Sequence, residues 1–327
     1  MKKHLIGVDI GGTKIMGGVV DDGGNLLTSL KKPTPTTNAR VLIEAVKEVI
    51  GELLTRDPGV LGTGLGVAGL VDWEEGMVTF SPNLPLKGVP LREEVRSFFG
   101  LPTFVDNDAN VAALGECRYG AGERSSNLVF IILGTGIGGG IIVDGKIYRG
   151  TRGYAGEIGH MVIDPRGPLC GCGNHGCLEA LASGQAIAVR AREAVAGGRA
   201  SSILELAGGK VENITAKTVT TATGKGDVLG REILSEAGRM LGIGLANLVN
   251  VFDPEIIIAG GGLAEAGELI LGPAREELEK RVMSPDSRRV EIVQAKLGAE
   301  AGVIGAATMA LEGIGGAATC QGSGSNN

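Results

Sequence analysis

Apolar runs broken by glycine and aspartate dominate the N-terminal end of the chain. Residues 4–30 read as strand, turn and strand in the order LIGVDI, GGTK, IMGGVV, DDGG and NLLTSL. Apolar and β-branched runs that are bounded by Gly and Asp are typical of β-hairpins. Residues 127–149, which contain LVFIILGTGIGGGIIVDGKIY, repeat this pattern. The repetition suggests an internal duplication, with one hairpin in each of two domains.

Helical periodicity appears first in residues 38–56, where apolar side chains return every three or four positions and predict an amphipathic helix. The apolar face comprises Val41, Ile43, Ala45, Val46, Val49, Ile50 and Leu53. The following GVLGTGLGVAGLVD reads as a buried strand that opens into a loop. Residues 90–99 predict a short helix with Pro90 near its start, where the N–H that proline lacks is not needed.

The second half of the chain predicts one more strand and a largely helical region. A strand that ends at Val105 is followed by a helix from about Ala109. Residues 182–250 read as mostly helical, 256–262 (IIIAGGG) as a buried strand running into a glycine turn, and 301–312 as the last helix. Within the helical region, one apolar face comprises Leu234, Ala237, Leu241, Leu245 and Leu248.

Composition excludes several classes of protein. The chain of 327 residues is long enough for two domains, and its 43% hydrophobic content is that of a globular protein. The net charge of −6 comes without a basic stripe, so we expect no nucleic-acid partner. An acidic soluble enzyme with a small-molecule substrate fits these values better.

Neither the N-terminal segment nor the longest apolar run indicates export or insertion into a membrane. The start MKKHLIGVDIGG has the two lysines of a signal peptide, but Asp9 interrupts the apolar run and no cleavage site follows. The apolar run 128–143 is too short and too rich in glycine to span a bilayer. We therefore expect no membrane partner and a cytoplasmic location.

A histidine and three cysteines gather in residues 157–179, EIGHMVIDPRGPLCGCGNHGCLE. His160, Cys170, Cys172 and Cys177 make a closed tetrahedral set of one nitrogen and three sulfurs, which is typical of structural Zn²⁺.

The spacing of this segment requires tight turns. Gly171, Gly173 and Gly176 lie among the cysteines, and glycine reaches positive φ without a Cβ clash. Glu157 and Glu179 flank the four ligands without being needed by a metal. We infer that zinc shapes the loop, which directs carboxylates and an imidazole at something polar.

Two alternatives stand beside this interpretation. The three cysteines could form a disulfide and a spare thiol, which would suit a secreted protein. His175 is a rival ligand, although it lies where the loop must turn. We favour zinc over the disulfide, and His160 over His175.

Three glycine-rich turns, each following a buried strand, indicate a nucleotide held between two domains. In the first, which comprises Asp9, Gly11, Gly12, Thr13 and Lys14, backbone N–H groups can bind phosphate as a nest. Lys14 adds a charge, Thr13 adds a hydroxyl, and Asp9 can hold Mg²⁺ through water. The other two turns span 134–140 and 259–262.

Known nucleotide fingerprints do not apply. Residues 64–69 and 134–139 match G-x-G-x-x-G, but strand-like segments follow them, whereas the dinucleotide fingerprint needs a helix there. The chain has no Walker A motif.

Asp108 is the candidate catalytic carboxylate. It lies at a strand-to-helix junction, where Asp is also a common helix N-cap, so that alternative stays open. Asn107 and Asn83 supply amides suited to recognising hydroxyls, although Asn83 could equally be a turn residue. Phosphoryl transfer needs a base, a metal on the phosphates and donors for developing charge. Asp108, Asp9 with Mg²⁺ and the glycine turns match those requirements.

Seven motifs, in order over nearly the whole chain, resemble the ROK family of sugar kinases, and within it the bacterial ATP-dependent glucokinases. They are DIGGTK at 9–14, SPNLP at 81–85, DNDAN at 106–110, LGTGIGGG at 133–140, EIGH at 157–160, CGCGNHGCLE at 170–179 and IIIAGGG at 256–262. The cysteine motif is the most specific of them.

The resemblance implies an actin-like fold of two ribonuclease-H-like α/β domains that close on a sugar. The small domain would comprise residues 1–108 and 301–312, and the large one residues 109–300 with the zinc loop 157–179. Residues 313–327 have the composition of a flexible tail.

The implied activity is transfer of the ATP γ-phosphate to a hexose 6-hydroxyl, with Asp108 as general base. The sugar-contacting positions would be Gly69, Asn83, Asn107, Asp108, Glu157, His160 and Glu179, so that His160 serves both sugar and zinc. The ATP positions would be Asp9, Gly11, Gly12, Thr13, Lys14, Gly134, Thr135 and Gly136 for the phosphates, and Gly260 and Gly261 for adenosine. His160, Cys170, Cys172 and Cys177 match the zinc ligands, whereas Cys117 and Cys320 match nothing.

Alternatives within the family remain. The sugar could be N-acetylmannosamine, N-acetylglucosamine, fructose or mannose instead of glucose, or the protein could be a sugar sensor without catalysis. The family's repressors carry a helix-turn-helix ahead of DIGGTK, for which the residues before Asp9 leave no room. The resemblance also implies a homodimer or homotetramer.

Overall fold

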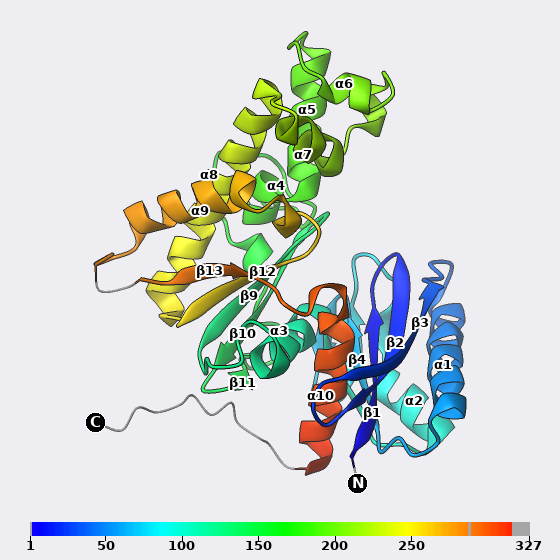
Figure 1. Cartoon of the computed structure of the whole chain (residues 1–327). Helices are drawn as coiled ribbons and strands as arrows, with labels where there is room; N and C mark the ends of the chain where they lie inside the picture. Colours follow the sequence, from blue (N-terminus) through cyan, green and yellow to red (C-terminus); the bar gives the residue numbers. More distant parts are fainter. Residues whose placement is uncertain (1, 287–288, 316–327) are drawn as a thin grey trace. The chain divides into compact units, whose positions relative to one another are not determined.

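The computed structural model describes residues 2–286 and 289–315, and its contacts divide the chain into two compact units (Figure 1). Of the described residues, the first unit takes 2–130, 140–156 and 295–315, and the second takes 131–139, 157–286 and 289–294. This division groups helix α3 with the N-terminal segment, whereas the limits expected from sequence separate them at residue 108. Those expected domain limits stay a prediction.

The first unit is built on a five-stranded sheet in the order β3-β2-β1-β4-β8 and a small sheet in the order β5-β6-β7. Its strands are β1 His4–Ile10, β2 Lys14–Asp21, β3 Leu26–Pro33, β4 Thr63–Val67, β5 Leu70–Asp72, β6 Met77–Phe80, β7 Lys87–Val89, β8 Thr103–Asn107 and β11 Lys146–Ile147. Its helices are α1 Ala39–Arg56, α2 Leu91–Phe99, α3 Asp108–Tyr119 and α10 Ala301–Gly315, with a 3₁₀ turn η4 at Gly298–Glu300.

The second unit is mainly helical. Its helices are α4 Leu178–Ala182, α5 Gly184–Ala196, α6 Ile203–Leu206, α7 Ala216–Gly224, α8 Val228–Phe252 and α9 Glu268–Arg281. It also has strands β12 Ile256–Gly260 and β13 Glu291–Gln294, and 3₁₀ turns η1 Ile158–His160, η2 Val211–Asn213 and η3 Ala264–Ala266. The boundary between the units falls within β9 Leu128–Leu133 and β10 Ile137–Val143.

The second five-stranded sheet has the order β11-β10-β9-β12-β13, which repeats the order of the first. In each sheet the hairpin seen in the sequence supplies the first strands, and a later parallel pair extends the sheet, β4–β8 in one and β12–β13 in the other. The repetition expected from residues 4–30 and 127–149 is therefore confirmed at the level of topology.

Helices cover both faces of the first sheet (Figure 1). Ile6 and Val8 of β1 belong to the core shared with α1, whereas Leu5 packs with Val303 of α10 on the opposite face. The α10 backbone comes very close to the sheet, because a Cβ added to Gly7 would lie 1.9 Å from the Val303 carbonyl oxygen. Because side chains alternate along a strand, Asp9 lies on the face that α10 covers.

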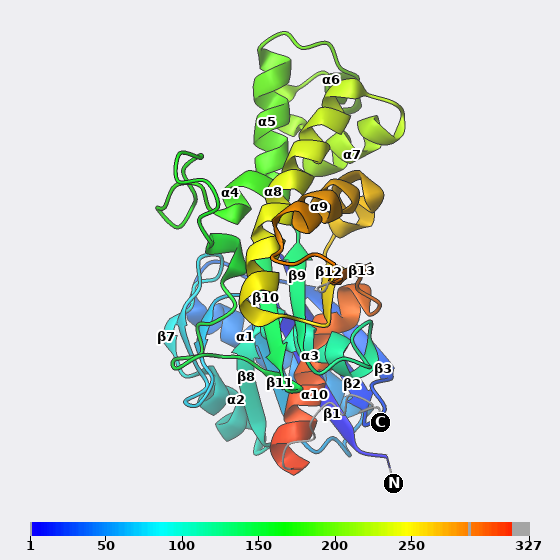
Figure 2. The same cartoon turned by 90° about the vertical axis from the view of Figure 1, so that its left-hand side faces the viewer.

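The predicted apolar face of the long helix is confirmed. Leu234, Ala237, Leu241, Leu245 and Leu248 of α8 are all buried. Figure 2 shows α9 beside α8. Their backbones approach closely where a Cβ on Gly238 would lie 2.5 Å from the Ile270 carbonyl oxygen.

Several element limits differ from those expected. Strand β8 continues past Val105 to Asn107, and α3 begins at Asp108. Helix α10 runs through Gly315, so the expected tail is helical in its first three residues. The rest of that tail, including Cys320, lies outside the described residues.

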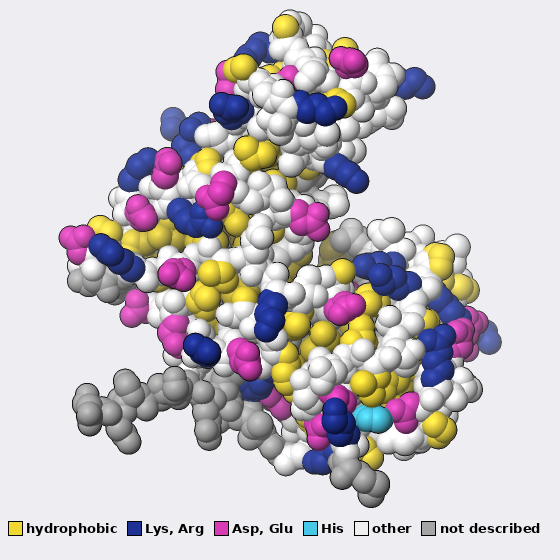
Figure 3. Space-filling model, viewed as in Figure 1, with side chains coloured by type: hydrophobic (Ala, Val, Ile, Leu, Met, Phe, Trp, Pro, Cys, Tyr) yellow, Lys and Arg dark blue, Asp and Glu magenta, His cyan; other side chains and the backbone are white. Residues whose placement is uncertain are grey.

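The surface carries both signs of charge. On the face shown in Figure 3, basic and acidic side chains are interspersed, which agrees with the expectation of no basic stripe on that face. Within the described residues, none of the helices combines the length and the apolarity needed to cross a lipid bilayer.

Candidate functional site

Three parallel strands of the first unit end at one edge of their sheet. Ile10 at the end of β1 pairs with Val67 of β4, and Val67 pairs with Asn107 of β8. The ends of these strands and the segments that follow them are therefore neighbours, and they contain Asp9 to Lys14, Gly69, Asn107 and Asp108. Of the positions expected to be functional in this unit, only Asn83 comes from elsewhere.

Asn107 organises this edge. Its side-chain Oδ1 accepts hydrogen bonds from the N–H groups of Ala109 at 2.8 Å and Asn110 at 3.1 Å, which makes it the N-cap of α3. Its Nδ2 donates to the Gly69 carbonyl oxygen at 3.0 Å. Asp108 is thus the first residue of the helix, and the alternative that Asp108 is the N-cap is wrong.

Two carboxyl groups at this edge hold their protons more tightly than usual. Burial raises the pKa of Asp108, although the Ala109 N–H and Asn107 act to lower it. Burial also raises the pKa of Asp9 to about 7; the Asp108 charge adds to this, and Lys14 opposes it. A carboxylate with a raised pKa is a better proton acceptor near neutral pH.

The turn after β1 is tightly closed. The Gly11 N–H donates to the Lys14 carbonyl oxygen at 3.1 Å, and the Thr34 hydroxyl donates to the Gly11 carbonyl oxygen at 2.7 Å. Gly12 lies against Asn83, since a Cβ on Gly12 would be 3.3 Å from the Asn83 Cβ. Lys14 is exposed. The turn therefore adjoins the segment that carries Asn83.

Gly69 joins this segment to the strand ends. Its φ of +150° requires glycine, and a Cβ would lie 2.5 Å from the Phe80 carbonyl oxygen. The Ser81 hydroxyl donates to the Ala68 carbonyl oxygen at 2.6 Å and accepts from the Leu84 N–H at 3.1 Å. The exposed Asn83 is thus held on a segment tied to Gly69.

In the second unit the predicted metal ligands come together. One donor atom each from His160, Cys170, Cys172 and Cys177 lies within 4.8 Å of the others. The His160 Nδ1 is 3.7 Å from the Cys170 sulfur, and the sulfurs of Cys172 and Cys177 are 3.6 Å apart. All three cysteines are free, so the disulfide alternative is not what this structure contains.

The loop around them turns at two of the three expected glycines. Gly173 and Gly176 have φ of +92° and +69°, and a Cβ on Gly176 would overlap the Asp164 carbonyl oxygen. Gly171 does not have positive φ, so that expectation was wrong for it. His175 stands apart from the cluster, with its Nδ1 3.1 Å from the Gly167 carbonyl oxygen.

Burial holds the pKa of two of the three thiols of this cluster above the ordinary range. Burial raises the pKa of Cys177 to about 12 and also raises that of Cys170. The Asn174 N–H lowers the pKa of Cys172 to about 7. Because zinc binds thiolates, metal binding here would release protons.

Glu179 connects the cysteine loop to the glycine turn between β9 and β10. It lies two residues after Cys177, and its Oε2 accepts a hydrogen bond from the Ile137 N–H at 2.9 Å. Gly136 leaves room for this carboxylate, since a Cβ there would lie 2.3 Å from the same oxygen. The turn is also held by α5, whose Gly184 N–H donates to the Gly134 carbonyl oxygen at 2.9 Å.

The remaining predicted positions lie around these two features. The Gln185 N–H donates to the Thr135 carbonyl oxygen at 3.1 Å. Gly260 ends β12, and Gly261 has φ of +86° with room only for glycine beside the Leu133 carbonyl oxygen. Glu157 has an Oε2 4.0 Å from the His160 Nε2, which is the ring nitrogen that faces away from the Cys170 sulfur.

The sequence did not reveal a buried ion pair behind the strand end. Asp106 is 1% exposed, and its Oδ1 accepts from the Asn107 N–H at 2.7 Å and from the Asn110 Nδ2 at 2.9 Å. Its Oδ2 accepts from the Arg149 Nε at 2.6 Å. The sequence placed Asp106 just after a strand expected to end at Val105, and a carboxylate at such a position does not identify its partner.

The comparisons with known proteins agree with this geometry. The pattern of the ROK family matches residues 5–313. A glucokinase from Streptomyces coelicolor is 41% identical over 310 residues, which cover 94% of this chain and 97% of that protein. A glucokinase from Thermotoga maritima is 38% identical over 317 residues, covering 96% and 99%.

A solved structure is similar over the same length. It is a ROK family glucokinase from Streptomyces griseus in complex with glucose and AMPPNP, and it is 39% identical to this chain. The TM-score is 0.85, and the match covers 94% of this chain and 99% of the other.

The substitution Asp106→Asn tests whether the buried ion pair supports the strand end. We expect the unfolding free energy to fall by about 1–3 kcal/mol, because Arg149 loses a charged acceptor. Thermal unfolding of the variant measures this effect. The control is Asp22→Asn, at an exposed carboxylate, which should unfold at the wild-type temperature. Equal unfolding temperatures for the two variants would show that the pair contributes no stability.

Proposed function

The chain belongs to the ROK family, and from this premise we propose that it is a glucokinase that transfers the γ-phosphate of ATP to the 6-hydroxyl of glucose. Its actin-like two-domain fold is the one that ROK sugar kinases have. The observation that carries the proposal is Asp108, a carboxylate of raised pKa at the sheet edge that also bears the Gly11–Lys14 turn. The relatives named glucokinases support glucose as the acceptor.

In the proposed reaction Asp108 takes the proton of the glucose 6-hydroxyl. The oxygen then forms a bond to the γ-phosphorus of ATP, the bond from that phosphorus to the β,γ-bridging oxygen breaks, and ADP leaves. Asn107 keeps Asp108 at the first position of α3, so the backbone that carries this carboxylate is held in place. Fixed placement is what this reaction mainly requires, because little covalent chemistry falls to the protein.

We assign the other predicted positions to the substrates. Asn83, Glu157, His160 and Glu179 would hold the sugar hydroxyls, together with Asn107 and the Gly69 backbone. Gly11, Gly12, Thr13, Lys14, Gly134, Thr135 and Gly136 would hold the phosphates, and Gly260 and Gly261 the adenosine. The Glu179 Oε2 already accepts from the Ile137 N–H, and its Oε1 accepts from the Cys170 thiol at 3.9 Å, so a sugar hydroxyl at Oε1 would meet a carboxylate held on both sides.

A magnesium ion fits beside Asp9, because carboxylate oxygen is a ligand that Mg²⁺ prefers. When bound with ATP, it neutralises phosphate charge. The pKa of Asp9, raised to about 7 by burial, fits a carboxyl whose charge is compensated only when a cation is present.

Zinc fits the cluster of His160, Cys170, Cys172 and Cys177 by the identity and spacing of the donors. We assign it a structural role. The His160 Nδ1 faces the sulfurs and its Nε2 lies toward Glu157, so one imidazole can serve both a metal and a polar ligand. The family resemblance further predicts a homodimer or homotetramer in the cytoplasm.

Asp108→Asn tests the proposed base. We expect kcat to fall by about 10²–10⁴-fold, because the amide cannot accept the proton, while glucose binding changes little. Coupled release of ADP and calorimetric titration with glucose measure the two effects. The exposed Asp144→Asn is the matched control and should keep wild-type turnover. In the wild type, kcat/KM should also decline as the pH falls through the Asp108 pKa, which burial raises above the ordinary range of an aspartate.

If the Asp108→Asn variant turned over within a few-fold of the wild-type rate, Asp108 would not be the general base. Loss of turnover together with loss of glucose binding would point to a disrupted site instead.

A panel of acceptors at fixed Mg-ATP tests the sugar. We expect the highest kcat/KM for glucose among glucose, mannose, fructose, N-acetylglucosamine and N-acetylmannosamine, measured by ADP release. Sugars that differ at one hydroxyl lose the hydrogen bond made to it, which leaves a buried polar group unpaired. Repeating the assay with polyphosphate in place of ATP shows which of the two is the phosphate donor.

A different best sugar would keep the kinase and correct its substrate. Tight sugar binding without ADP release from any sugar would favour the sensor alternative.

Cys172→Ser tests the zinc centre. Metal analysis should find close to one zinc per wild-type chain and clearly less in the variant, because one of the four ligands is lost. The variant should also unfold at lower temperature and show a raised KM for glucose. His175→Ala is the control, since that imidazole lies outside the cluster, and it should keep its zinc. Wild-type protein that carries no zinc and binds none when it is added would exclude the centre.

A further inference from the structure

The first unit contains a cavity of about 830 Å³ that the proposed reaction does not use. Its wall includes Thr103 and Phe104, which begin β8, whereas Asn107 and the candidate base lie at the other end of that strand. Within the described residues, β8 pairs only with β4, so the cavity runs along the edge strand of the sheet.

The wall of the cavity carries more positive than negative charge. Its basic residues are Arg92, Arg96, Lys146 and Arg149, and its acidic residues are Glu74 and Glu312. One of the acids is already neutralised, because the Glu312 Oε1 accepts from the Arg118 Nε at 2.7 Å. Two of the cations are paired as well, Arg96 with Glu93 and Arg149 with Asp106. Within the described residues, the lining charges outside these ion pairs are those of Arg92, Lys146 and Glu74.

Two of these cations have no acidic partner. Arg92 donates to the backbone carbonyl oxygens of Glu74, at 2.5 Å, and Trp73, and its Nε is buried without a hydrogen-bond acceptor. Across residues 2–286 and 289–315, neither Arg92 nor Lys146 forms an ion pair with a carboxylate. A cavity with uncompensated cations is suited to an anion.

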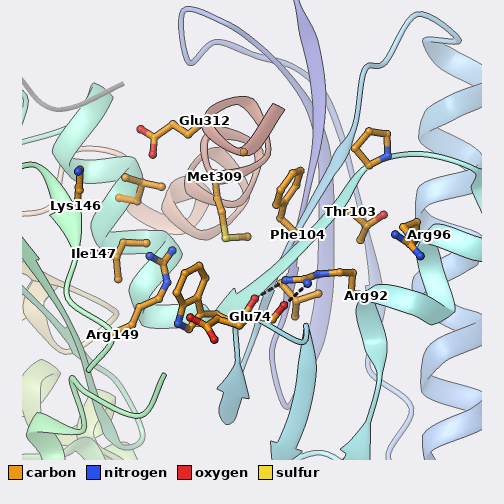
Figure 4. A pocket seen from close by; sticks show the side chains of 15 residues that line it. Glu74, Arg92, Arg96, Thr103, Phe104, Lys146, Ile147, Arg149, Met309 and Glu312 are labelled. Atoms are coloured by element: carbon orange, nitrogen blue, oxygen red, sulfur yellow. Dashed lines mark hydrogen bonds between the residues drawn. The ribbon is translucent and has the colours of Figure 1, made fainter. Parts of the chain in front are cut away.

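The middle of the cavity is apolar and partly aromatic. In the view of Figure 4, Met309 and Phe104 lie between Lys146 and Arg96. The Arg149 guanidinium lies over the Trp73 ring, 4.6 Å from its centroid. Aromatic and thioether side chains of this kind accept a flat ring by stacking and edge contacts.

We propose that this cavity binds a phosphate monoester of a planar, ring-containing small molecule. A phosphate monoester is an anion at neutral pH, which suits the two cations without an ion pair, Arg92 and Lys146, and its oxygens suit the forked donors of arginine. The ring would lie against Trp73, Phe104 and Met309. This site is separate from the proposed kinase site, and its occupancy does not depend on the kinase proposal.

The chain provides its own reporter for this site. Trp73 is the single tryptophan among the 327 residues, so tryptophan fluorescence of the whole protein reports on the cavity wall. The test titrates the full chain with phenyl phosphate, which combines a ring with the required charge. We expect a saturable change in fluorescence that persists when AMPPNP and glucose are present in excess. Phenol, which lacks the charge, and inorganic phosphate, which lacks the ring, should each bind at least tenfold more weakly.

A charge reversal gives the matched comparison. Lys146→Glu should weaken phenyl phosphate at least tenfold, and this exposed position should tolerate the change without loss of thermal stability. Lys225→Glu, at an exposed lysine of the second unit, should leave the affinity unchanged. Calorimetry at rising salt concentration gives a second measurement, because screening should lower the affinity of a charged ligand.

Three results would overturn the proposal. The first is the absence of a saturable change up to millimolar phenyl phosphate. The second is equal affinity for phenol or for inorganic phosphate, which would remove the need for either charge or ring. The third is displacement by AMPPNP, which would assign the binding to the nucleotide site.

Discussion

The amide of Asn107 is the interaction on which the candidate active site depends. One side chain caps α3 through its oxygen and holds the Gly69 carbonyl through its nitrogen. It thereby fixes both where the helix starts and where the neighbouring strand end lies. Asp108 has its position because the cap precedes it, and desolvation at its half-buried place at the start of α3 raises its pKa. Phosphoryl transfer to a hydroxyl requires a general base whose position is fixed and whose pKa is raised.

In the second unit, a carboxylate rather than an amide holds two segments of the candidate site together. Glu179 follows a cysteine of the metal cluster and accepts from the backbone of the β9–β10 turn. The Glu179 side chain therefore links the cysteine loop directly to the turn that we propose for the phosphates. A metal held by the four candidate ligands would therefore steady this turn, because a displaced loop would displace Glu179 and with it the Ile137 N–H.

Arg149 belongs to two environments at once. Its Nε donates to Asp106, which in turn accepts from the Asn107 N–H, and its guanidinium also lies over Trp73 in the wall of the cavity. The cavity and the strand end that bears the candidate base thus share one side chain within the first unit. A ligand that attracted this guanidinium would compete with Asp106 for it, which links the two sites energetically without contact between their ligands.

The sequence by itself determined whatever depends on neighbours along the chain. Periodicity placed the helix after Asn38, glycine and aspartate marked the hairpins, and three cysteines close together with His160 identified the cluster of candidate metal ligands. The tertiary structure alone decided the pairings over long separations, such as Asp106 with Arg149, 43 residues apart, and Glu179 with Ile137, 42 apart. It also decided that Asn107, and not Asp108, caps α3. Local sequence patterns reflect the conformational preferences of single segments. The long-range contacts form only when packing brings distant segments together, and the type of a residue does not identify its distant partner.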